Sequence, residues 1–279
     1  YSCHTAKEFR GSLERGKDMT SIENILAVYN ASACDSLQKQ VLSRILKHLR
    51  ELNHMTIYQL ADECYTSPAT ISRMVKKLGY KNYSYFQKAI ADDVVQYEHH
   101  NRPIPIDQVP KGKSLSDAFL DTLDRLLKSM REHLDQRGIQ TLVETIHKSK
   151  RIDIYSYAGY FAEMFLQSDV FLSGKVCDIY QQEQDMIEHA KMLTENDLVI
   201  YLAPKCIEGT KSDNIVDHIQ KNKAKVCIIT DSRYSAGLKK ADIKFIFDGV
   251  MHSVDMLVLQ AFLCIIVIEY RRVYIDEIE

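Results

Sequence analysis

Hydrophobic residues recur at three- and four-residue spacings through the first hundred positions, which is the pattern of amphipathic helices. Ile25, Leu26 and Tyr29 can share one short apolar face near the start of this stretch. Further helical segments are expected over residues 36–52, after Thr56, after Ser67 and over residues 84–96. We therefore predict an all-α domain in this part of the chain.

The pattern changes beyond residue 115, where helical periods alternate with short β-branched runs. The predicted strands are residues 151–155, 176–180, 197–202, 225–230 and 243–247. The predicted helices are residues 115–134, 138–149, 159–172, 186–193, 213–222, 235–241 and 252–272. Alternation of this kind favours an α/β domain with a parallel sheet flanked by helices on both faces.

A proline-rich segment separates the two patterns. Residues 102–110 hold three of the five prolines, and proline cannot continue a helix interior. We expect a helical domain over residues 19–100, a stiff linker over 101–114 and the α/β domain over 115–279. Residues 1–18 carry mixed charge without an apolar period and precede Met19, so we interpret them as an upstream or added segment.

Composition narrows the class of protein. The chain is 46% hydrophobic and 27% charged with a formal net charge of −2, so nucleic-acid contact would need a local basic patch. Its seven scattered cysteines form no C-x-x-C pair, which disfavours a disulfide framework or zinc site and suits a reducing cytosol. The most apolar run, residues 256–268, is too short to span a bilayer. We expect a cytoplasmic protein without metal or other cofactor.

The candidate DNA-reading helix begins after a turn. Ser67 can cap it, and Pro68 fits the first helical position, where its missing N–H costs nothing. Thr70 and Arg73 could contact base edges in the major groove, the arginine through both donors of its fork. The expected DNA-contact residues are Ser67, Ala69, Thr70, Ser72, Arg73, Lys76, Lys77 and Lys81.

This segment resembles the RpiR family of bacterial regulators. Residues 67–80 read SPATISRMVKKLGY and residues 82–86 read NYSYF, which fit the family's S-x-x-T-[VI]-x-R, L-G-[FY] and Y-x-x-F patterns. Residues 60–64, LADEC, also resemble its L-A-x-x-x segment. The resemblance implies a transcription regulator of carbohydrate metabolism, with a helix-turn-helix joined to a SIS (sugar isomerase) domain. It also implies a homodimer on a palindromic operator of double-stranded DNA, with a small phosphosugar-like effector.

The SIS resemblance implies that hydroxyl groups in loops after the parallel strands hold the phosphate, where helix N-termini also favour anions. The first loop reads SYAGY over residues 156–160, so Tyr160 stands where the family has a serine. The second reads APKCIEGTKS over residues 203–212 and departs from the family's S-x-S-G-x-T. The candidate effector residues are Ser156, Tyr157, Tyr160, Lys205, Thr210 and Ser212. Three interpretations stay open: a phosphosugar effector, another small metabolite, or a vestigial pocket in a domain that only dimerises.

The sequence supports an enzyme less well than a transcription regulator. Asp185, Glu188 and His189 resemble an acid/base group, but we interpret them as a solvated helix face and expect no catalytic residue or enzyme activity. Tyr155 lies beside Tyr157 and Tyr160, and these rings could stack on a ligand or form a buried aromatic edge. The rival functions are a SIS-type aldose–ketose isomerase and an interaction module that has lost DNA binding.

Overall fold

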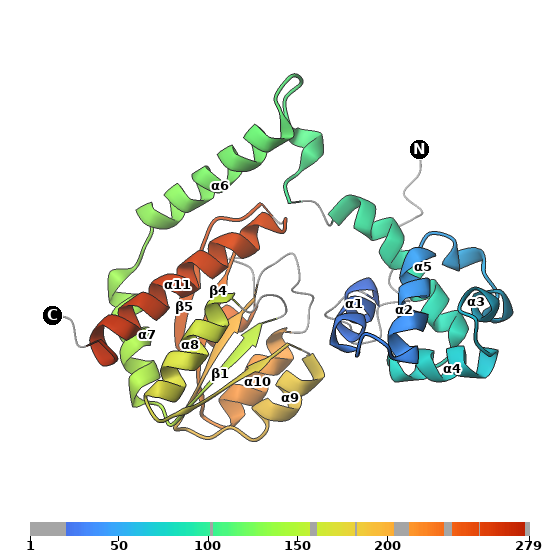
Figure 1. The fold of residues 1–279 in the computed structure, drawn as a ribbon. Coiled ribbons are helices and arrows are strands. Elements are labelled where there is room, and N and C mark those ends of the chain that lie inside the picture. Colours follow the sequence, from blue (N-terminus) through green and yellow to red (C-terminus); the bar gives the residue numbers. More distant parts are fainter. Residues whose placement is uncertain are drawn as a thin grey trace. The chain divides into compact units, whose positions relative to one another are not determined.

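The chain divides into two compact units. In the computed structural model the described residues are 21–100, 103–156, 161–181, 183–203, 212–231, 236–250 and 252–276. One unit comprises Met19–Asn101 and the other contains Arg102–Glu279 (Figure 1). The expected upstream segment, residues 1–18, lies outside the described residues.

The described part of the N-terminal unit is helical, as predicted. Its elements are α1 (Ser21–Ala31), α2 (Leu37–Lys47), the 3₁₀ turn η2 (Leu52–His54), α3 (Ile57–Glu63), α4 (Pro68–Lys77) and α5 (Tyr83–His100). Helix α2 ends five residues before the predicted Leu52, because the chain turns at His48. Leu52 is nevertheless fully buried, since η2 returns it to the core.

All five α-helices contribute to one hydrophobic core in this unit. Helix α1 contributes the buried Ile22 and Ile25 to this core, whereas Leu26 is 37% exposed. The prediction that Leu26 shares the inner face is therefore wrong; the three-residue step from Ile22 to Ile25 defines that face. Asp93 of α5 accepts from the backbone N–H of Ile22 at 3.2 Å, so a carboxylate satisfies the positive end of α1.

The second unit is a doubly covered parallel sheet. Its strands are β1 (Arg151–Ser156), β2 (Val176–Tyr180), β3 (Asp197–Leu202), β4 (Lys225–Thr230) and β5 (Ile243–Ile246), in the order β2-β1-β3-β4-β5. Every strand pair is parallel. Its helices are η3 (Ile106–Gln108), α6 (Leu115–Glu132), α7 (Gln136–Lys148), α8 (Phe161–Leu172), α9 (Glu183–Ala190), α10 (Ser212–Lys221), η4 (Ala236–Lys239) and α11 (Val254–Tyr274). The predicted α/β fold is confirmed, although the helix expected over 235–241 is only the short 3₁₀ turn η4.

Alternation along the strands sends side chains to two separate cores. On one face Ile152 and Ile154 pack with residues of α7, α8 and α11, and α6 lies along α11. On the other face Tyr155 and Tyr201 pack with residues of α9 and α10. Helices therefore cover both faces of the sheet, as predicted (Figure 1).

From Pro103 onward the proline-rich segment packs on the second unit. Ile104 is buried in the core formed by α6, α7, α8 and α11, with Ile106 and Val109 packed against the same core. The carbonyl of Pro103 accepts from the backbone N–H of Val254, at the start of α11, at 3.2 Å. The segment is thus held at its beginning by a backbone hydrogen bond and a buried isoleucine.

Candidate nucleic-acid interface and sheet-edge site

Helix α4 begins with the cap that the sequence predicts. Ser67 has extended backbone geometry, and its hydroxyl oxygen accepts from the N–H of Thr70 at 3.2 Å. Pro68 follows as the first helical residue. The hydroxyls of Ser67 and Thr70 lie 3.0 Å apart, so two polar side chains and the helix N-terminus meet at one place. Such an end favours an anion.

The two sides of α4 differ sharply in chemistry. Ile71, Met74 and Val75 are buried against the rest of the unit. The candidate DNA-contact residues all lie on the accessible side or beside it: Ser67, Ala69, Arg73, Lys76, Lys77 and Lys81 are exposed, while Thr70 and Ser72 are partly exposed. The fold therefore frees these side chains for a ligand while the apolar ones hold the helix in place.

Arg73 and Thr70 point into the same space. An Nη of the Arg73 guanidinium lies 3.5 Å from the Thr70 hydroxyl oxygen, which is a long contact on an exposed surface. Lys77 donates to the side-chain oxygen of Gln38 on α2. Arg73 would therefore lose only a weak contact, and little free energy, on forming hydrogen bonds to a base edge. Major-groove recognition by arginine requires a guanidinium that is free in this way.

Sequence reasoning missed two residues beside α4: Tyr65, at the turn between α3 and α4, and Arg44 of α2. Tyr65 has φ 49°, a left-handed conformation unusual for a bulky side chain, and is 82% exposed. The Arg44 guanidinium of α2 lies 4.7 Å from the centre of its ring. This stacked pair adds a cation and an aromatic surface next to α4. No glycine marks the turn, so its geometry has no clear signal in the sequence.

The charge distribution around α4 is one-sided. Between Glu63 and Asp92 the chain carries five Lys or Arg and no Asp or Glu. A stretch free of acids attracts phosphates even though the whole chain has a net charge of −2. This run was visible in the sequence and strengthens the interface beyond the individual side chains.

The second candidate site lies at the carboxyl edge of the sheet. The chain leaves β1 for β2 on one side and later returns to β3 on the other, so β1 and β3 form the topological switch point. Ser156 and Leu202 are register partners at the ends of these strands, so the loops that follow begin side by side. Ligands of open α/β sheets bind at this position.

The described residues cover only part of this candidate site. Ser212 is the first residue of α10. Tyr157, Tyr160, Lys205 and Thr210 lie outside the described residues.

Ser156 belongs to a buried polar network that the sequence did not reveal. Its hydroxyl donates to Glu163 of α8 at 2.8 Å, and both side chains are fully buried. The Gln260 amide of α11 donates to the two carboxylate oxygens of Glu163 at 2.8 and 2.9 Å. These bonds join β1, α8 and α11 directly beside the first loop. Only the fold could reveal them, because Gln260 lies 97 positions from Glu163.

His189 is buried, so interpreting it as part of a solvated helix face is wrong. The Tyr155 hydroxyl lies 3.1 Å from its Nδ1, and the Tyr180 ring stacks on it with centroids 4.3 Å apart. Burial lowers the pKa of His189. Asp185 and Glu188 do lie on the exposed side of α9. Tyr155 is fully buried, which resolves its role as part of a buried aromatic edge.

An ion pair between the buried Asp153 carboxylate and the partly exposed Arg151 lies beneath α9. The Nε of Arg151 lies 3.1 and 3.0 Å from the two carboxylate oxygens of Asp153, and Arg151 also pairs with Asp178. Burial raises the pKa of Asp153 to about 7, with the Arg151 charge opposing that shift. Nε2 of His189 lies 3.8 Å from Asp153. This cluster packs between the sheet and α9, and we assign it to stability.

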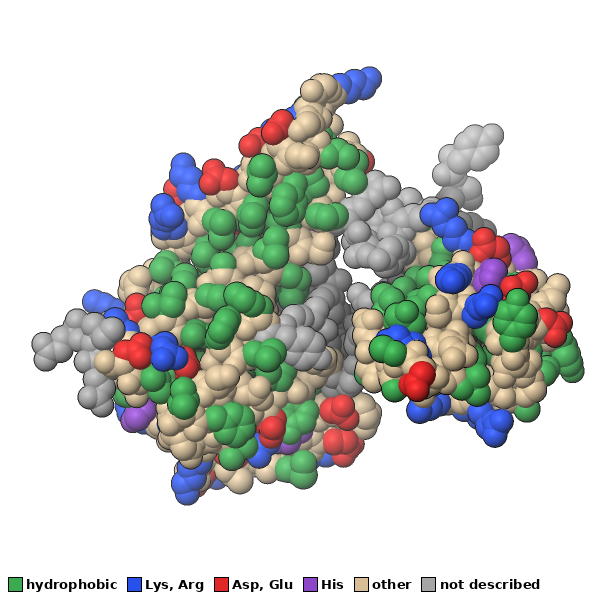
Figure 2. All heavy atoms as spheres, in the orientation of Figure 1, with side chains coloured by type: hydrophobic (Ala, Val, Ile, Leu, Met, Phe, Trp, Pro, Cys, Tyr) green, Lys and Arg blue, Asp and Glu red, His purple; other side chains and the backbone are tan. Residues whose placement is uncertain are grey.

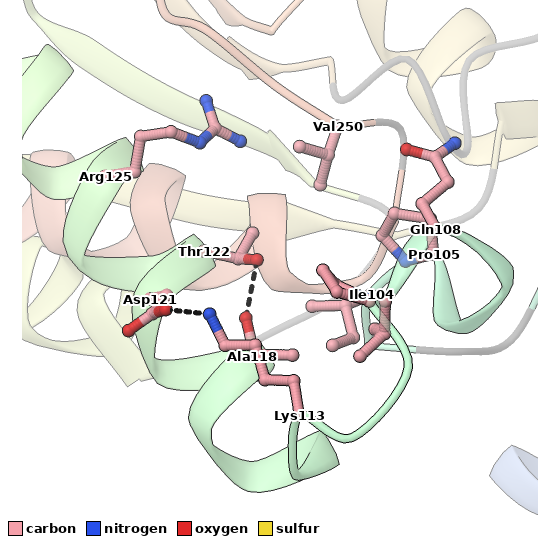
Figure 3. A pocket seen from close by; sticks show the side chains of 11 residues that line it. Ile104, Pro105, Gln108, Lys113, Ala118, Asp121, Thr122, Arg125 and Val250 are labelled. Carbon is pink, nitrogen blue, oxygen red and sulfur yellow. Dashed lines mark hydrogen bonds and ion pairs between the residues drawn. The ribbon is translucent and has the colours of Figure 1, made fainter.

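A cleft of about 280 Å³ lies where the proline-rich segment meets α6. Pro105 and Val109 form part of its apolar lining. Figure 3 shows the Arg125 guanidinium pointing across the cleft toward Val250, with Gln108 on the far side. The contact between the segment and α6 is therefore incomplete, although Ile104, which also lines the cleft, is buried.

Residues 23–97 match the family model described as a helix-turn-helix domain of the rpiR family. The N-terminal unit is an RpiR-family helix-turn-helix domain. The match includes α4, the turn before it and the acid-free basic stretch. The resemblance seen in the sequence is thereby confirmed for this RpiR domain.

Solved structures establish the fold of the second unit. The RpiR transcription factor of Sphaerobacter thermophilus (sugar isomerase domain) is 15% identical with a TM-score of 0.52, over 59% of this chain and 94% of that one. The NanR protein of Vibrio vulnificus, complexed with ManNAc-6P, is 16% identical with a TM-score of 0.51, over 92% of this chain and 93% of that one. At these identities the likeness concerns the fold alone. The chain thus joins an RpiR helix-turn-helix domain to a SIS-like domain.

Two further findings bear on the class of protein. No curated protein matches the sequence significantly. Within the described part of the chain, no helix has the length and apolar character needed to cross a membrane, and no cluster of three or more His, Cys, Asp or Glu could hold a metal ion.

Proposed function

We propose that the protein is a sequence-specific, DNA-binding transcription regulator that responds to a small phosphorylated sugar. The observation that carries this proposal is the exposed face of α4, capped by Ser67 and set in an acid-free basic stretch of an RpiR-family domain. An isomerase would have no use for this face. The proposal therefore favours regulation over catalysis.

The DNA contacts divide by chemistry. Thr70 and Arg73 read base edges, because they project from the first two turns of α4. Ser67 and the free N–H groups of the helix start bind a backbone phosphate. Lys76, Lys77 and Lys81 neutralise further phosphates, while Ala69 and Ser72 leave room for the helix in the groove. A homodimer would place two such helices on a palindromic operator.

The effector would bind where β1 and β3 end. The fold supports this position because the switch point and the start of α10, at Ser212, lie along one sheet edge. Lys205, Thr210 and Ser212 would hold the phosphate, and Tyr157 and Tyr160 would pack on the sugar. Ser156 would support the loop from beneath through Glu163. NanR, which shares the fold, was solved with ManNAc-6P and suggests the sugar-phosphate class.

Signal transmission would use the proline-rich segment. Pro103, the first residue of the segment that the structure describes, is bonded to the start of α11, and Gln260 of the same helix is bonded to Glu163 beside the first loop. A ligand that alters this helix would alter the point from which the DNA-binding unit departs. Regulation requires that the effector bind the two arrangements with different affinity.

Two separate experiments test the proposal. In vitro selection from random duplexes should enrich a palindromic sequence, and absence of any enriched sequence would overturn DNA-specific regulation. Thermal unfolding against a panel of phosphosugars should reveal the effector, because a ligand at about 100 times its Kd stabilises by about 2.7 kcal/mol. The matched non-phosphorylated sugars serve as controls. Stabilisation by both forms, or by neither, would contradict the phosphosugar assignment, and turnover of the sugar would favour an isomerase.

A further inference from the structure

The turn between α3 and α4 exposes a tyrosine that folding alone does not explain. Tyr65 has φ 49°, a conformation that suits glycine and costs free energy for a residue with a side chain. Its ring is 82% exposed, so it buries little apolar area to offset that strain. Strained backbone that persists in a folded protein is often found at binding sites. The Tyr65 side chain is therefore a candidate for contact with a ligand.

Arg44 of α2 places a positive charge on this ring. Its guanidinium carbon lies 4.7 Å from the centre of the Tyr65 ring, and its side chain is partly exposed. Stacking covers one face of a guanidinium but leaves its N–H donors, which lie in the plane, free to bond at the edge. Arg44 forms no ion pair with any residue that the structure describes. Glu63, the acid nearest to Tyr65 in the sequence, lies 3.5 Å from Nε2 of His48 instead.

The turn that carries Tyr65 is well fixed and lies at the start of α4. The N–H of Tyr65 donates to the carbonyl of Asp62 at 3.0 Å, and the N–H of Thr66 donates to the carbonyl of Ala61 at 2.9 Å. Two residues after Tyr65, Ser67 caps α4. Figure 2 shows Lys and Arg side chains along the border of this unit where Figure 1 places α4. A preorganised cation beside a basic helix suits a polyanion that extends past the helix.

We propose that Arg44 and Tyr65 form a binding site for a DNA backbone phosphate, separate from the phosphate site at the start of α4. The Arg44 guanidinium donates to two phosphate oxygens, whose spacing its fork matches. The Tyr65 hydroxyl donates a further hydrogen bond, and its ring holds the guanidinium in place. Such a contact fixes the register of α4 on the duplex without reading sequence. This inference rests on the proposed function, because its ligand is duplex DNA.

A purely structural role explains the stack less well. A cation–aromatic contact on an exposed surface gains no more free energy than a left-handed tyrosine costs. Glycine at position 65 would allow the same turn with neither the strain nor the stack. The contact with a phosphate supplies the reason for a tyrosine at this position.

Fluorescence anisotropy of the full chain on labelled duplexes measures the charge that the site contributes. Arg44→Gln should weaken binding to a selected operator and to a scrambled duplex alike, by about tenfold at about 0.1 M salt, because one phosphate contact is lost. The slope of log affinity against log salt should fall by about 1. Arg131→Gln on α6 is the matched control, because it removes the same charge from an exposed helix position of the other unit.

Two substitutions of Tyr65 separate binding from folding. Tyr65→Phe keeps the ring and the stack, so it should weaken binding by about fivefold through the lost hydroxyl, with the salt slope unchanged. Tyr65→Gly should weaken binding at least as much, although it relieves backbone strain and should melt no lower than Tyr65→Ala. These variants keep the test decisive if Arg44→Gln fails to fold.

Ethylation interference on the operator locates the contact. One phosphate in each half-site should weaken binding of the wild-type chain when ethylated but have no effect on Arg44→Gln, while Lys77→Ala stays sensitive to it. A structural role for the stack would leave the set of sensitive phosphates unchanged. Unchanged affinity in Arg44→Gln, Tyr65→Phe and Tyr65→Gly, or an unchanged ethylation pattern in Arg44→Gln, would overturn the proposal.

This site and the proposed function fail in different ways. A chain that selects an operator but binds it equally well without Arg44 would remain a regulator and lose only this site. A chain that selects no DNA sequence would remove the proposed function, whereas the effect of Arg44→Gln on affinity and salt slope would still be measured on any duplex, because a phosphate contact does not depend on sequence.

Discussion

Arg73 and Lys77 lie one turn apart on α4 but should affect DNA binding differently. Arg73→Ala should cost about 1–3 kcal/mol on the selected operator and much less on a scrambled duplex, because it removes a base contact. Lys77→Ala should weaken both duplexes alike and reduce the salt slope by about 1, because it removes a phosphate contact. Fluorescence anisotropy at several salt concentrations measures both, with Arg131→Ala on α6 as the control. Equal losses for Arg73→Ala on the two duplexes would rule out base reading by that residue.

Arg151 should matter most at alkaline pH. Burial raises the folded-state pKa of Asp153 to about 7, so this carboxyl contributes stability at low pH and loses that contribution as pH rises through about 7. Arg151→Met removes the opposing charge, raises that pKa further and leaves a buried carboxylate unpaired, which costs about 3 kcal/mol. Urea unfolding should therefore show a larger loss at pH 8 than at pH 5. The exposed Arg131→Met is the control, and a loss independent of pH would contradict the assignment.

At the scale of elements, the turn between α3 and α4 depends on a strained tyrosine. Tyr65 at φ 49° should be relieved by glycine, so Tyr65→Gly should be more stable than Tyr65→Ala by about 1 kcal/mol. At Tyr58, an exposed position within α3, the order should reverse, because glycine disfavours a helix. Thermal unfolding of the four variants measures this. The same order at both positions would show that the turn stores no strain.

The elements themselves were predictable where their signals are local. The five strands agree with prediction to within one residue at each end, because buried parallel strands are continuous β-branched runs. The start of α4 was also predictable, because Ser67 as a cap and Pro68 at the first helical position are signals within the segment itself. His189 was misplaced because a polar residue on a short helix looks solvent-facing until its partners, Tyr155 and Tyr180, are known. The Ser156–Glu163–Gln260 network was out of reach because its members meet only in the folded chain.

At the scale of the whole molecule, response to an effector should depend on the short connection between the units. Only two residues separate His100, the end of α5, from the docked Pro103, and they span at most about 10 Å. Inserting Gly-Ser-Gly-Ser between residues 101 and 102 should preserve operator binding and largely abolish its change with effector. The same insertion after Gly174, in the turn between α8 and β2, is the control. An unchanged effector response in the first variant would show that the signal takes another route.

Helix α5 has a mechanical consequence for this arrangement. Its 18 residues span about 27 Å, and its last residue, His100, comes three positions before Pro103 in the sequence. A rod of that length turned by about 10° moves its far end by about 5 Å, which exceeds the 3.4 Å rise of one base-pair step. If a change at Pro103 turned α5 by this small angle, the recognition helix would move by more than one base-pair step. It would then no longer match its half-site. A small rotation of α5, rather than a large rearrangement, would then be enough for an effector to change DNA binding.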